Sequence, residues 1–382
     1  MNAIHTLRWF NFGYFSLFAL FLSFLPVYLS SRGISETGIG LMMGAGGIVG
    51  LVAQPLWGVV SDRRRTIKKV LLFLLALSVV VGVATFQLST LWALAIGVGL
   101  MYFLFMPTDP LMESLNFQVA QKHGVPYGSV RMFGAIGYAT ASFAVGMATD
   151  AFGLGAMGVL FAGYGLATIL IAARAEDAPA ASKPLRWAEL QGFLSRRESL
   201  VFFLLVLLVA VPHRTNDLFV GIHITALGGD YRTVGMTWFV MTIAEVAFFG
   251  LAHRFLKPGR ELTVIALAAV LYVLRFALTS AAAQPFAVVL LQLLQGVTFV
   301  LFYTASIQYL YRIVPEPWRA TGQTILAVLF FGVSGIVASF LGGWVFDAFG
   351  GETLYRGMAA LSAIGAAYCF AVRGRKAAGA AE

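Results

Sequence analysis

The chain has 382 residues, of which 59% are hydrophobic and only 11% are charged, and its formal net charge is +9. A soluble globular domain carries about a quarter charged residues, so this composition, with a mean hydropathy of +0.85, excludes a soluble protein and indicates a membrane protein. The single cysteine, Cys369, excludes an internal disulfide and any metal or redox motif built on thiols.

Twelve apolar segments follow one another along the chain, and a helix that crosses a bilayer needs about 20 such residues. Runs such as "VLLFLLALSVVVGVATF" show no alternation of apolar and polar residues, so we expect helices and not barrel strands. No cleavable signal is found at the start, so the first helix is expected to stay in the chain. The predicted helices are 9–31, 36–60, 69–88, 91–118, 127–149, 154–173, 199–226, 233–253, 262–281, 285–312, 320–346 and 353–372.

The basic residues predict the orientation of these helices. The two termini and the even-numbered loops hold 20 of the 26 Lys and Arg residues. The odd-numbered loops hold only Arg32, Arg232 and Arg356. Because positive residues stay on the cytoplasmic side, we expect both termini in the cytoplasm of a cell whose inner (plasma) membrane holds the protein. The basicity therefore reflects topology, and no nucleic-acid partner is expected.

Two weak internal repeats indicate that the chain is duplicated. The motif "DAFG" at 150–153 returns at 347–350, and the loop "GVVSDRRRTIKK" after the second helix has a counterpart, "GLAHRFLKPGRE", after the eighth. Many secondary transporters consist of two such repeats with the substrate site between them. The repeats predict a six-helix bundle over 1–173 and a second over 199–382.

Between these halves lies the only long polar stretch, residues 174–198. Its first part has the composition of a linker. The segment "LRWAELQGFLSRR" could lie as an amphipathic helix on the inner membrane face, but a tether between the halves is the simpler interpretation.

Charged residues inside the predicted helices are the clearest functional signal. Glu113 and Arg131 lie 18 residues apart, on either side of a loop centred near Lys122. A helical hairpin folded there brings both side chains to a similar depth, and a buried charge must be paired or face a water-filled cavity. We therefore expect a Glu113–Arg131 pair at the floor of a central cavity. The alternative is a static ion pair that only joins two helices.

Several motifs resemble one family. "GVVSDRRRTIKK" is similar to the signature loop of the major facilitator superfamily, with Gly58, Asp62 and Arg63 in place. The segments "ETGIGLMMGAGGIVGLVAQPLWGVVSDR", "YGSVRMFGAIGYA", "QLLQGVTFVLFYTAS" and "RATGQ" resemble the proton symporters of the lactose permease and phenylpropionate permease group. The resemblance covers nearly the whole chain and implies an all-α membrane fold of twelve helices in two pseudo-symmetric bundles.

The resemblance implies roles for residues of the first half. Glu113 and Arg131 match a pair that contacts the substrate in lactose permease. Tyr138 stands where lactose permease has a tryptophan that stacks on the sugar ring. The loop residues Asp62 and Arg63, with Gly58, match a gate that closes the cytoplasmic side. From their polarity alone, the remaining candidate cavity residues are Asn11, Tyr14 and Gln292.

In the second half, Arg275 and Gln295 match positions that carry an arginine and a histidine in the resembling lactose permease. Thr298 stands where that protein has the glutamate that carries the proton. A threonine does not carry a proton at physiological pH, so a proton site in this chain must lie elsewhere.

We place four acids and three arginines inside the membrane, away from the loops, so one acid lacks an obvious fixed cation. The acids are Asp109, Glu113, Asp217 and Glu245, and the arginines are Arg131, Arg214 and Arg275. Arg214 and Asp217 can pair because they are three residues apart on one helix, whereas Glu245 could pair with Arg275 or stand alone. Asp109, between two prolines, is expected to satisfy local backbone donors. The candidates for the proton site are Glu245, Asp217, His213 and Glu113.

The sequence therefore predicts a secondary transporter that moves a small organic solute by alternating access and proton symport, with an organic (aromatic) acid favoured over a sugar or nucleoside. A proton-antiport exporter and a non-transporting membrane sensor are the alternatives, and an enzyme is the least favoured class. "GLGAMG" at 153–158 lacks the strand context of a nucleotide-binding loop. We expect no cofactor and no metal, and the partners are the solute, protons and the lipid bilayer, with the protein a monomer.

Overall fold

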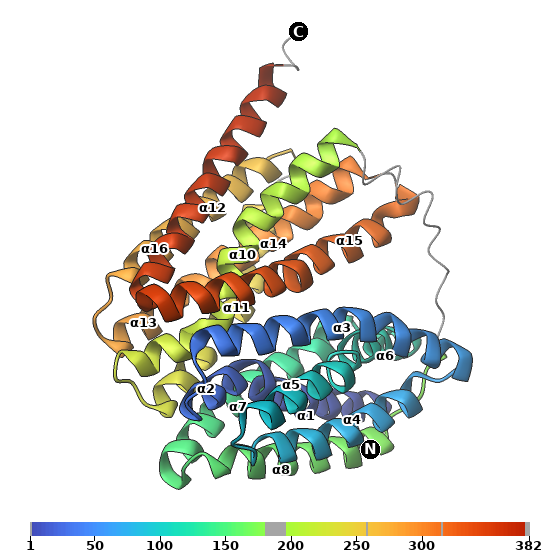
Figure 1. Cartoon of the computed structure of the whole chain (residues 1–382). Coiled ribbons are helices and arrows are strands. Elements are labelled where there is room, and N and C mark those ends of the chain that lie inside the picture. The colour runs from blue at the N-terminus through green and yellow to red at the C-terminus, as the bar shows by residue number, and fades with distance from the viewer. Residues whose placement is uncertain (1, 180–195, 257–258, 315, 379–382) are drawn as a thin grey trace.

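The computed structural model describes residues 2–179, 196–256, 259–314 and 316–378, and these residues form helices and turns without strands (Figure 1). The first helix set comprises α1 (Ala3–Ala19), η1 (Leu20–Phe24), α2 (Leu25–Ser31), α3 (Glu36–Arg64), α4 (Ile67–Thr85), α5 (Leu91–Leu104), α6 (Thr108–Lys122), α7 (Tyr127–Phe152) and α8 (Gly155–Ala173). The second helix set comprises α10 (Arg197–Ala226), α11 (Tyr231–Phe255), α12 (Glu261–Ser280), α13 (Pro285–Leu291), α14 (Leu293–Ile313), η2 (Glu316–Trp318), α15 (Arg319–Ala327), η3 (Val328–Val333) and α16 (Ser334–Ala378).

Eleven helical segments of the described chain are long and apolar enough to cross a membrane. The last of them, Thr321–Gly374, extends over 54 residues. Its helix α16 is interrupted at Gly350, where φ is 81° and ψ is 168°, a conformation that is open to glycine but strained for other residues. Figure 1 shows the chain reversing its direction at this place. The predicted all-helical membrane fold is confirmed, and the count of twelve spans stays a prediction.

Prolines account for two interruptions of the first helix set. Pro26 has no N–H to give to the preceding turn, and the helix widens into the π-helical turn Leu20–Phe24 just before it. Pro107 precedes α6, so the predicted helix over 91–118 is divided into α5 and α6. The breaks place Ser23 in the π-helical turn and Thr108 at the start of α6.

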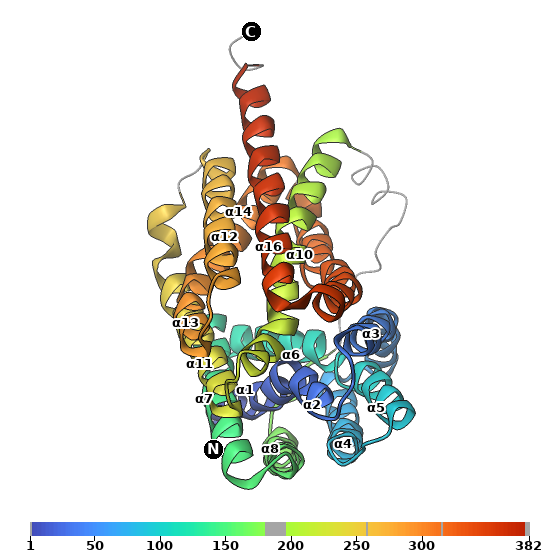
Figure 2. The ribbon, with the colours of Figure 1, turned by 60° about the vertical axis from the view of Figure 1, so that its left-hand side comes forward.

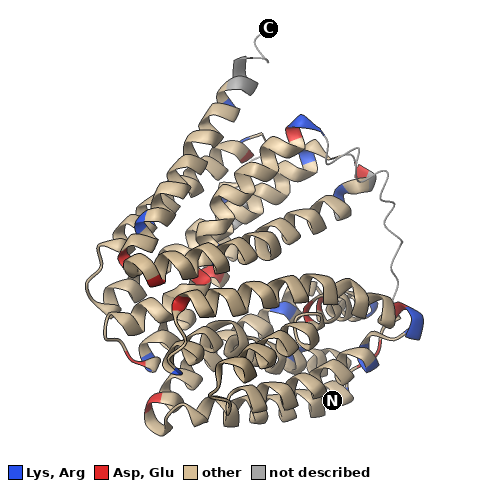
Figure 3. Cartoon of the chain, in the orientation of Figure 1, with Lys and Arg blue, Asp and Glu red and all other residues tan. Residues whose placement is uncertain are grey.

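The outer faces of the helices are apolar, as lipid contact requires. Val80 is 68% exposed, Val159 is 72% exposed and Ile364 is 58% exposed, and such exposed side chains occur on helices of both sets. Figure 3 shows long stretches of helix without charge, with Lys and Arg gathered mainly at helix ends. An apolar surface this extensive marks contact with a membrane. The chain is a multi-pass membrane protein.

The two helix sets meet along two pairs of helices. In Figures 1 and 2 the helices of the first set lie below those of the second, and the sets diverge toward the connecting segment after residue 174. Helix α7 packs against α11, and α3 packs against α16. The predicted bundle boundaries stay predictions, and the candidate amphipathic helix "LRWAELQGFLSRR" lies almost wholly outside the described residues.

Glycines allow the backbones to touch at these two crossings. A Cβ atom added to Gly146 of α7 would collide with the carbonyl oxygen of Tyr231 at the start of α11, and one added to Gly235 would collide with the carbonyl oxygen of Ser142. The α3–α16 crossing repeats the arrangement at Gly40. We call the α7–α11 crossing the seam, and the side of the molecule with the residue 227–230 turn the seam end.

The opposite side carries the connection between the sets. There, Thr66 at the start of α4 donates a 2.5 Å hydrogen bond from its hydroxyl to the Asp177 carboxylate. Glu176 contacts both Lys122 and His123, and hydrogen bonds from these two side chains hold the pKa of Glu176 below its usual range. The first residues after α8 are therefore fixed to the first helix set. We call this side the linker end.

Candidate functional site

The predicted pair of the first helix set is present in the structure. Arg131 Nε donates to Glu113 Oε1 at 2.7 Å, and the hydroxyl of Tyr127 donates to the other carboxylate oxygen. The Arg131 guanidinium also lies over the Phe15 ring, 3.8 Å from its centroid, and the missing side chain of Gly134 leaves room for that ring. The two charged side chains are 37% and 30% exposed, so the pair is accessible and can be reorganised by a ligand.

Two other predicted residues of the first set are enclosed. Asn11 and Asn116 exchange hydrogen bonds of 2.7 and 2.8 Å, and Tyr14 bonds to the Thr108 hydroxyl at 3.0 Å. Both Asn11 and Tyr14 are fully buried, so they hold α1 against α6 in this conformation. Their role as cavity residues stays a prediction.

Asp109 does not do what its position between prolines suggested. Within the described residues its side chain makes no hydrogen bond, and the local N–H groups it was expected to satisfy bond to backbone carbonyls instead, such as that of Phe105. The helix start at α6 leaves few free donors because Pro107 and Pro110 have no N–H.

In the second helix set, Arg275 is a fully buried cation held by neutral groups. Its guanidinium donates to the side-chain oxygens of Gln292 and Gln295. Asn216 donates to Gln292 at 3.3 Å, and the Tyr355 hydroxyl donates to Asn216 at 3.1 Å. Among the described residues no carboxylate pairs with Arg275, and its Nε has no partner. Arg275 and Gln295, which the sequence singled out separately, therefore contact one another, and their role in substrate binding stays a prediction.

Asp217 is at the centre of a second charged group. Arg214 Nη1 donates to Asp217 at 2.8 Å, so the predicted pairing is confirmed. His213 Nε2 lies 3.5 Å from the same carboxylate, and its Nδ1 bonds to the Tyr272 hydroxyl at 3.0 Å. Gln295 donates to Asp217 at 3.4 Å and thereby links this group to Arg275.

Glu245 of α11 differs from Glu113 and Asp217, which each pair with an arginine. The Gln295 side chain is a neutral neighbour of the Glu245 carboxyl group. In the part of the chain that the structure describes, no arginine, lysine or histidine pairs with it. The sequence left open whether Glu245 pairs with Arg275 or stands alone, and in the structure it does not pair with Arg275.

Along the seam, functional residues of α7 and of α11 lie at similar depths. Asp150 and Gly146 of α7 meet the start of α11 at the seam end. Further in, the rings of Tyr138 and Trp238 meet edge to face with centroids 5.9 Å apart. Arg131 lies seven residues before Tyr138, and Glu245 lies seven residues after Trp238, so each is on the same helix face about 10 Å deeper. Arg131 and Glu245 therefore lie at a similar depth, closer to the linker end than the aromatic contact, and we call this depth the charged level.

Sequence reasoning missed Trp238 and Asp150. Trp238 was one of seven tryptophans in an apolar chain, and nothing in the sequence pairs it with Tyr138. Asp150 was seen only as part of the "DAFG" repeat, although its carboxylate accepts the N–H groups of Tyr231 and Arg232 at 2.9 and 2.8 Å. The repeat draws attention to Asp150 but does not predict this contact, since Asp347 of the second copy makes no hydrogen bond within the described residues.

The predicted gate residues lie at the linker end. Gly58 and Asp62 are in the last turns of α3, and a Cβ atom at Gly58 would meet nothing within 4 Å. The Asp62 carbonyl accepts the N–H of Arg65, whose φ of 51° ends the helix, and Arg63 is exposed. Their action as a gate stays a prediction.

Comparison with known proteins agrees with this architecture. The chain is 27% identical over 366 residues to maltose permease of Geobacillus stearothermophilus, covering 94% of this chain and 89% of the relative. It is 26% identical over 323 residues to a probable 3-phenylpropionic acid transporter of Escherichia coli (strain K12), covering 80% and 83%. A crystal structure of a mutant of the nucleoside transporter NupG superposes with a TM-score of 0.87 at 20% identity, covering 97% and 99%.

These likenesses extend over most of each chain and all point to membrane transporters and permeases. The model of the family described as MFS_1 like matches residues 4–357. The resemblance to the major facilitator superfamily is therefore confirmed, and the chain is a transporter of small solutes and not an enzyme. It belongs to the MFS_1 like family.

Proposed function

We propose that the chain crosses the membrane twelve times, as two six-helix bundles over 1–173 and 199–382 that are joined by 174–198, with both termini in the cytoplasm. A continuous helix of 54 residues would be about 80 Å long, whereas the hydrocarbon core is about 30 Å thick. The break at Gly350 divides this span into two lengths that each suit a bilayer. The basic residues at the linker end support the cytoplasmic orientation. We expect the protein to act as a monomer.

In this orientation the seam end is extracytoplasmic, and the structure is closed toward the outside. The support is the backbone contact of Gly146 with Tyr231 on one side and of Gly40 with Gly343 on the other. Such glycine contacts bring helices together more closely than larger residues permit. Opening the seam end while the linker end closes would carry a solute across by alternating access, with Asp62 and Arg63 closing the cytoplasmic side.

We propose proton symport with Glu245 as the proton site. Glu113 and Asp217 each have an arginine partner, whereas Glu245 has a neutral amide. A partly buried carboxylate without a cation is costly, and uptake of a proton removes that cost. Among the described residues Asp109 also lacks an ion-pair partner, but its helix α6 packs within the first helix set, whereas Glu245 lies on α11, which forms the seam between the sets. These two observations together carry the proposal. Asp217 is the second candidate, since the adjacent His213 and Arg214 would have to release it first.

The proposed substrate is a small organic acid with an aromatic ring. Arg275 is a buried cation without a carboxylate partner among the described residues, and Arg131 is accessible, so the two arginines offer sites for an anion. Tyr138 and Trp238 offer aromatic surface at the next level. The probable 3-phenylpropionic acid transporter among the relatives is named for such an acid.

A sugar or nucleoside is the second candidate, and a specific observation favours it. The amide side chains of Gln292 and Gln295, which surround Arg275, are donors and acceptors suited to hydroxyl groups. The maltose permease relative and the nucleoside transporter structure are named for such solutes.

Uptake by proteoliposomes tests the proposal. Purified protein would be reconstituted and given radiolabelled 3-phenylpropionate, maltose or uridine with an inward proton gradient, with protein-free vesicles as the control. Symport predicts accumulation of one solute that an uncoupler abolishes. Accumulation driven by the reversed gradient would instead identify the antiport exporter. Equal uptake with and without any gradient would contradict proton coupling.

A further inference from the structure

Trp238 of α11 carries a buried hydrogen-bond donor that the protein does not use. The side chain is 7% exposed, and its Nε1 has no hydrogen-bond partner among the described residues. A buried indole N–H usually finds a partner, and leaving such a donor unpaired costs about 1–3 kcal/mol. An unpaired donor in the core of a protein therefore calls for an explanation.

The position of Trp238 distinguishes it from the other tryptophan with an unpaired Nε1. Trp57 of α3 packs against Phe73 and Phe103 within the first helix set. Trp238 lies between the two sets, edge to face with Tyr138 of α7 at an interplanar angle of 62°. The unpaired donor of Trp238 is thus at the boundary that must rearrange during transport, and that of Trp57 is not.

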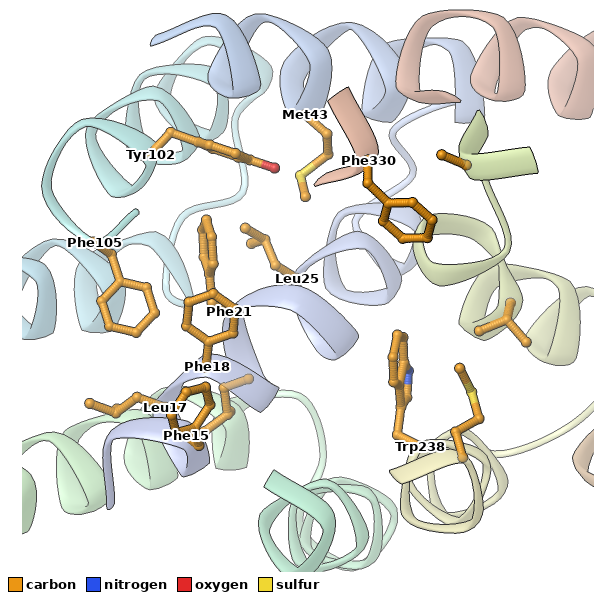
Figure 4. Packing of buried hydrophobic residues seen from close by; sticks show 14 of the residues in the cluster. Phe15, Leu17, Phe18, Phe21, Leu25, Met43, Tyr102, Phe105, Trp238 and Phe330 are labelled. Atoms are coloured by element: carbon orange, nitrogen blue, oxygen red, sulfur yellow. The ribbon is translucent and has the colours of Figure 1, made fainter. Parts of the chain in front are cut away.

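Polar groups lie on the helices that carry the Tyr138–Trp238 contact. The Tyr138 hydroxyl bonds to Ser23 of η1 at 2.7 Å, so that hydroxyl is already committed. Glu245 lies two turns deeper on the face of α11 that carries Trp238, and Arg131 lies two turns deeper on the face of α7 that carries Tyr138. Figure 4 shows the Trp238 ring standing out from its helix toward the middle of the molecule, with Phe330 beyond it.

We propose that Trp238 contacts the transported solute directly, with its indole face against a ring of the solute and its Nε1–H donating to a solute oxygen. The solute class is a ring compound with a carboxylate or hydroxyl acceptor close to the ring. This inference rests on the proposed transport function, and it adds the residue that fixes the ring. In the present conformation, the Tyr138 ring, in edge-to-face contact with the indole, takes the place of that ring.

The geometry separates two contributions of the side chain. Trp238→Phe keeps an aromatic face and removes the donor, so a solute oxygen loses its partner and affinity falls. A lost hydrogen bond of this kind corresponds to about 5- to 30-fold weaker binding. Trp238→Leu removes both the face and the donor, so the loss is larger, because aromatic stacking adds its own contribution.

Equilibrium binding to the purified full-length protein tests the inference, with 3-phenylpropionate, maltose and uridine as the probes. The wild type, Trp238→Phe, Trp238→Leu and the matched control Trp57→Phe would be titrated side by side, and thermal unfolding without probe would show that each variant is folded. We expect Trp57→Phe to bind within 2-fold of the wild type and Trp238→Phe to bind about 5- to 30-fold more weakly. Unchanged affinity of a folded Trp238→Phe variant would overturn the inference.

The same proteins separate this inference from the proposed function. If Trp238→Phe weakens binding while proton-driven uptake is absent from the wild type, the solute contact stands and proton symport fails. If proton-driven uptake is present and both Trp238 variants bind like the wild type, the contact fails alone. Failure of the wild type to bind any of the three probes would overturn both the solute class and the contact.

Discussion

Asp150→Ala is expected to loosen the contact between the two helix sets at the seam end. The Asp150 carboxylate of α7 accepts the N–H groups of Tyr231 and Arg232, the first two residues of α11. The next N–H, that of Thr233, is taken by Asp230 at 2.7 Å. Two carboxylates therefore cap the start of α11, which has four N–H groups without partners inside the helix. Only Asp150 joins the two sets in doing so.

The size of the effect follows from the cost of losing a helix cap. Replacing a capping side chain with alanine costs about 0.5–2 kcal/mol, and a negative charge at a helix N-terminus adds about 0.3–1 kcal/mol. Both hydrogen bonds of Asp150 are exposed, so water replaces part of what is lost. A net loss of about 1–2 kcal/mol corresponds to a 5- to 30-fold larger open fraction at the seam end, by the factor of ten for each 1.4 kcal/mol.

Cysteine labelling measures this fraction. Cys369 would be replaced by alanine, and Ser142→Cys would place a single thiol on α7, where the native side chain is fully buried beside Gly235. In detergent-purified protein, a polar maleimide reaches position 142 only when the seam opens. We expect Asp150→Ala to raise the labelling rate about 5- to 30-fold.

Asp347→Ala is the matched control. Asp347 occupies the place of Asp150 in the second "DAFG" motif, is exposed, and has no hydrogen bond or ion pair in the described part of the chain. Its removal is expected to change the rate less than 2-fold. A labelling rate that Asp150→Ala leaves unchanged, or that both variants raise equally, would refute the role of Asp150 as a connection between the sets.

Two further predictions concern the seam and the charged level. Gly146→Leu should hold the seam open and raise labelling at position 142, because its side chain would meet the backbone of α11, whereas Gly163→Leu, with nothing within 4 Å, should not. Glu113→Gln and Arg131→Met should each lower the unfolding temperature by leaving one partly buried charge unpaired, at about 1–3 kcal/mol. The double variant should recover part of that loss in a thermal-shift cycle, and strictly additive losses would mean that the two side chains do not interact.

The helices and two of the charged pairs could be predicted from the sequence because both depend on local spacing. Apolar runs of about 20 residues determine the spans. Arg214 and Asp217 are one turn apart, and Glu113 and Arg131 are symmetric about one hairpin, so no distant part of the chain is needed to bring them together.

Contacts between distant helices could not be predicted in this way. Asp150 and Tyr231 are 81 residues apart, and Tyr138 and Trp238 are 100 apart, so their meeting depends on which helices cross. The polarity of Asn11 suggested a cavity, but polarity does not distinguish a side chain that faces water from one that pairs with a neighbouring helix.

The central proposal is proton symport through Glu245, and the proton uptake of the Glu245→Gln variant tests it most directly. Proteoliposomes containing a pH-sensitive dye would be given the solute that the wild type transports, and the pH change on solute addition would be recorded for the wild type, Glu245→Gln and Asp217→Asn. A glutamine cannot take up the proton, so we expect no proton signal from Glu245→Gln while exchange of labelled for unlabelled solute continues. A proton signal of wild-type size from Glu245→Gln would contradict the proposal, and its loss in Asp217→Asn alone would assign the proton to Asp217.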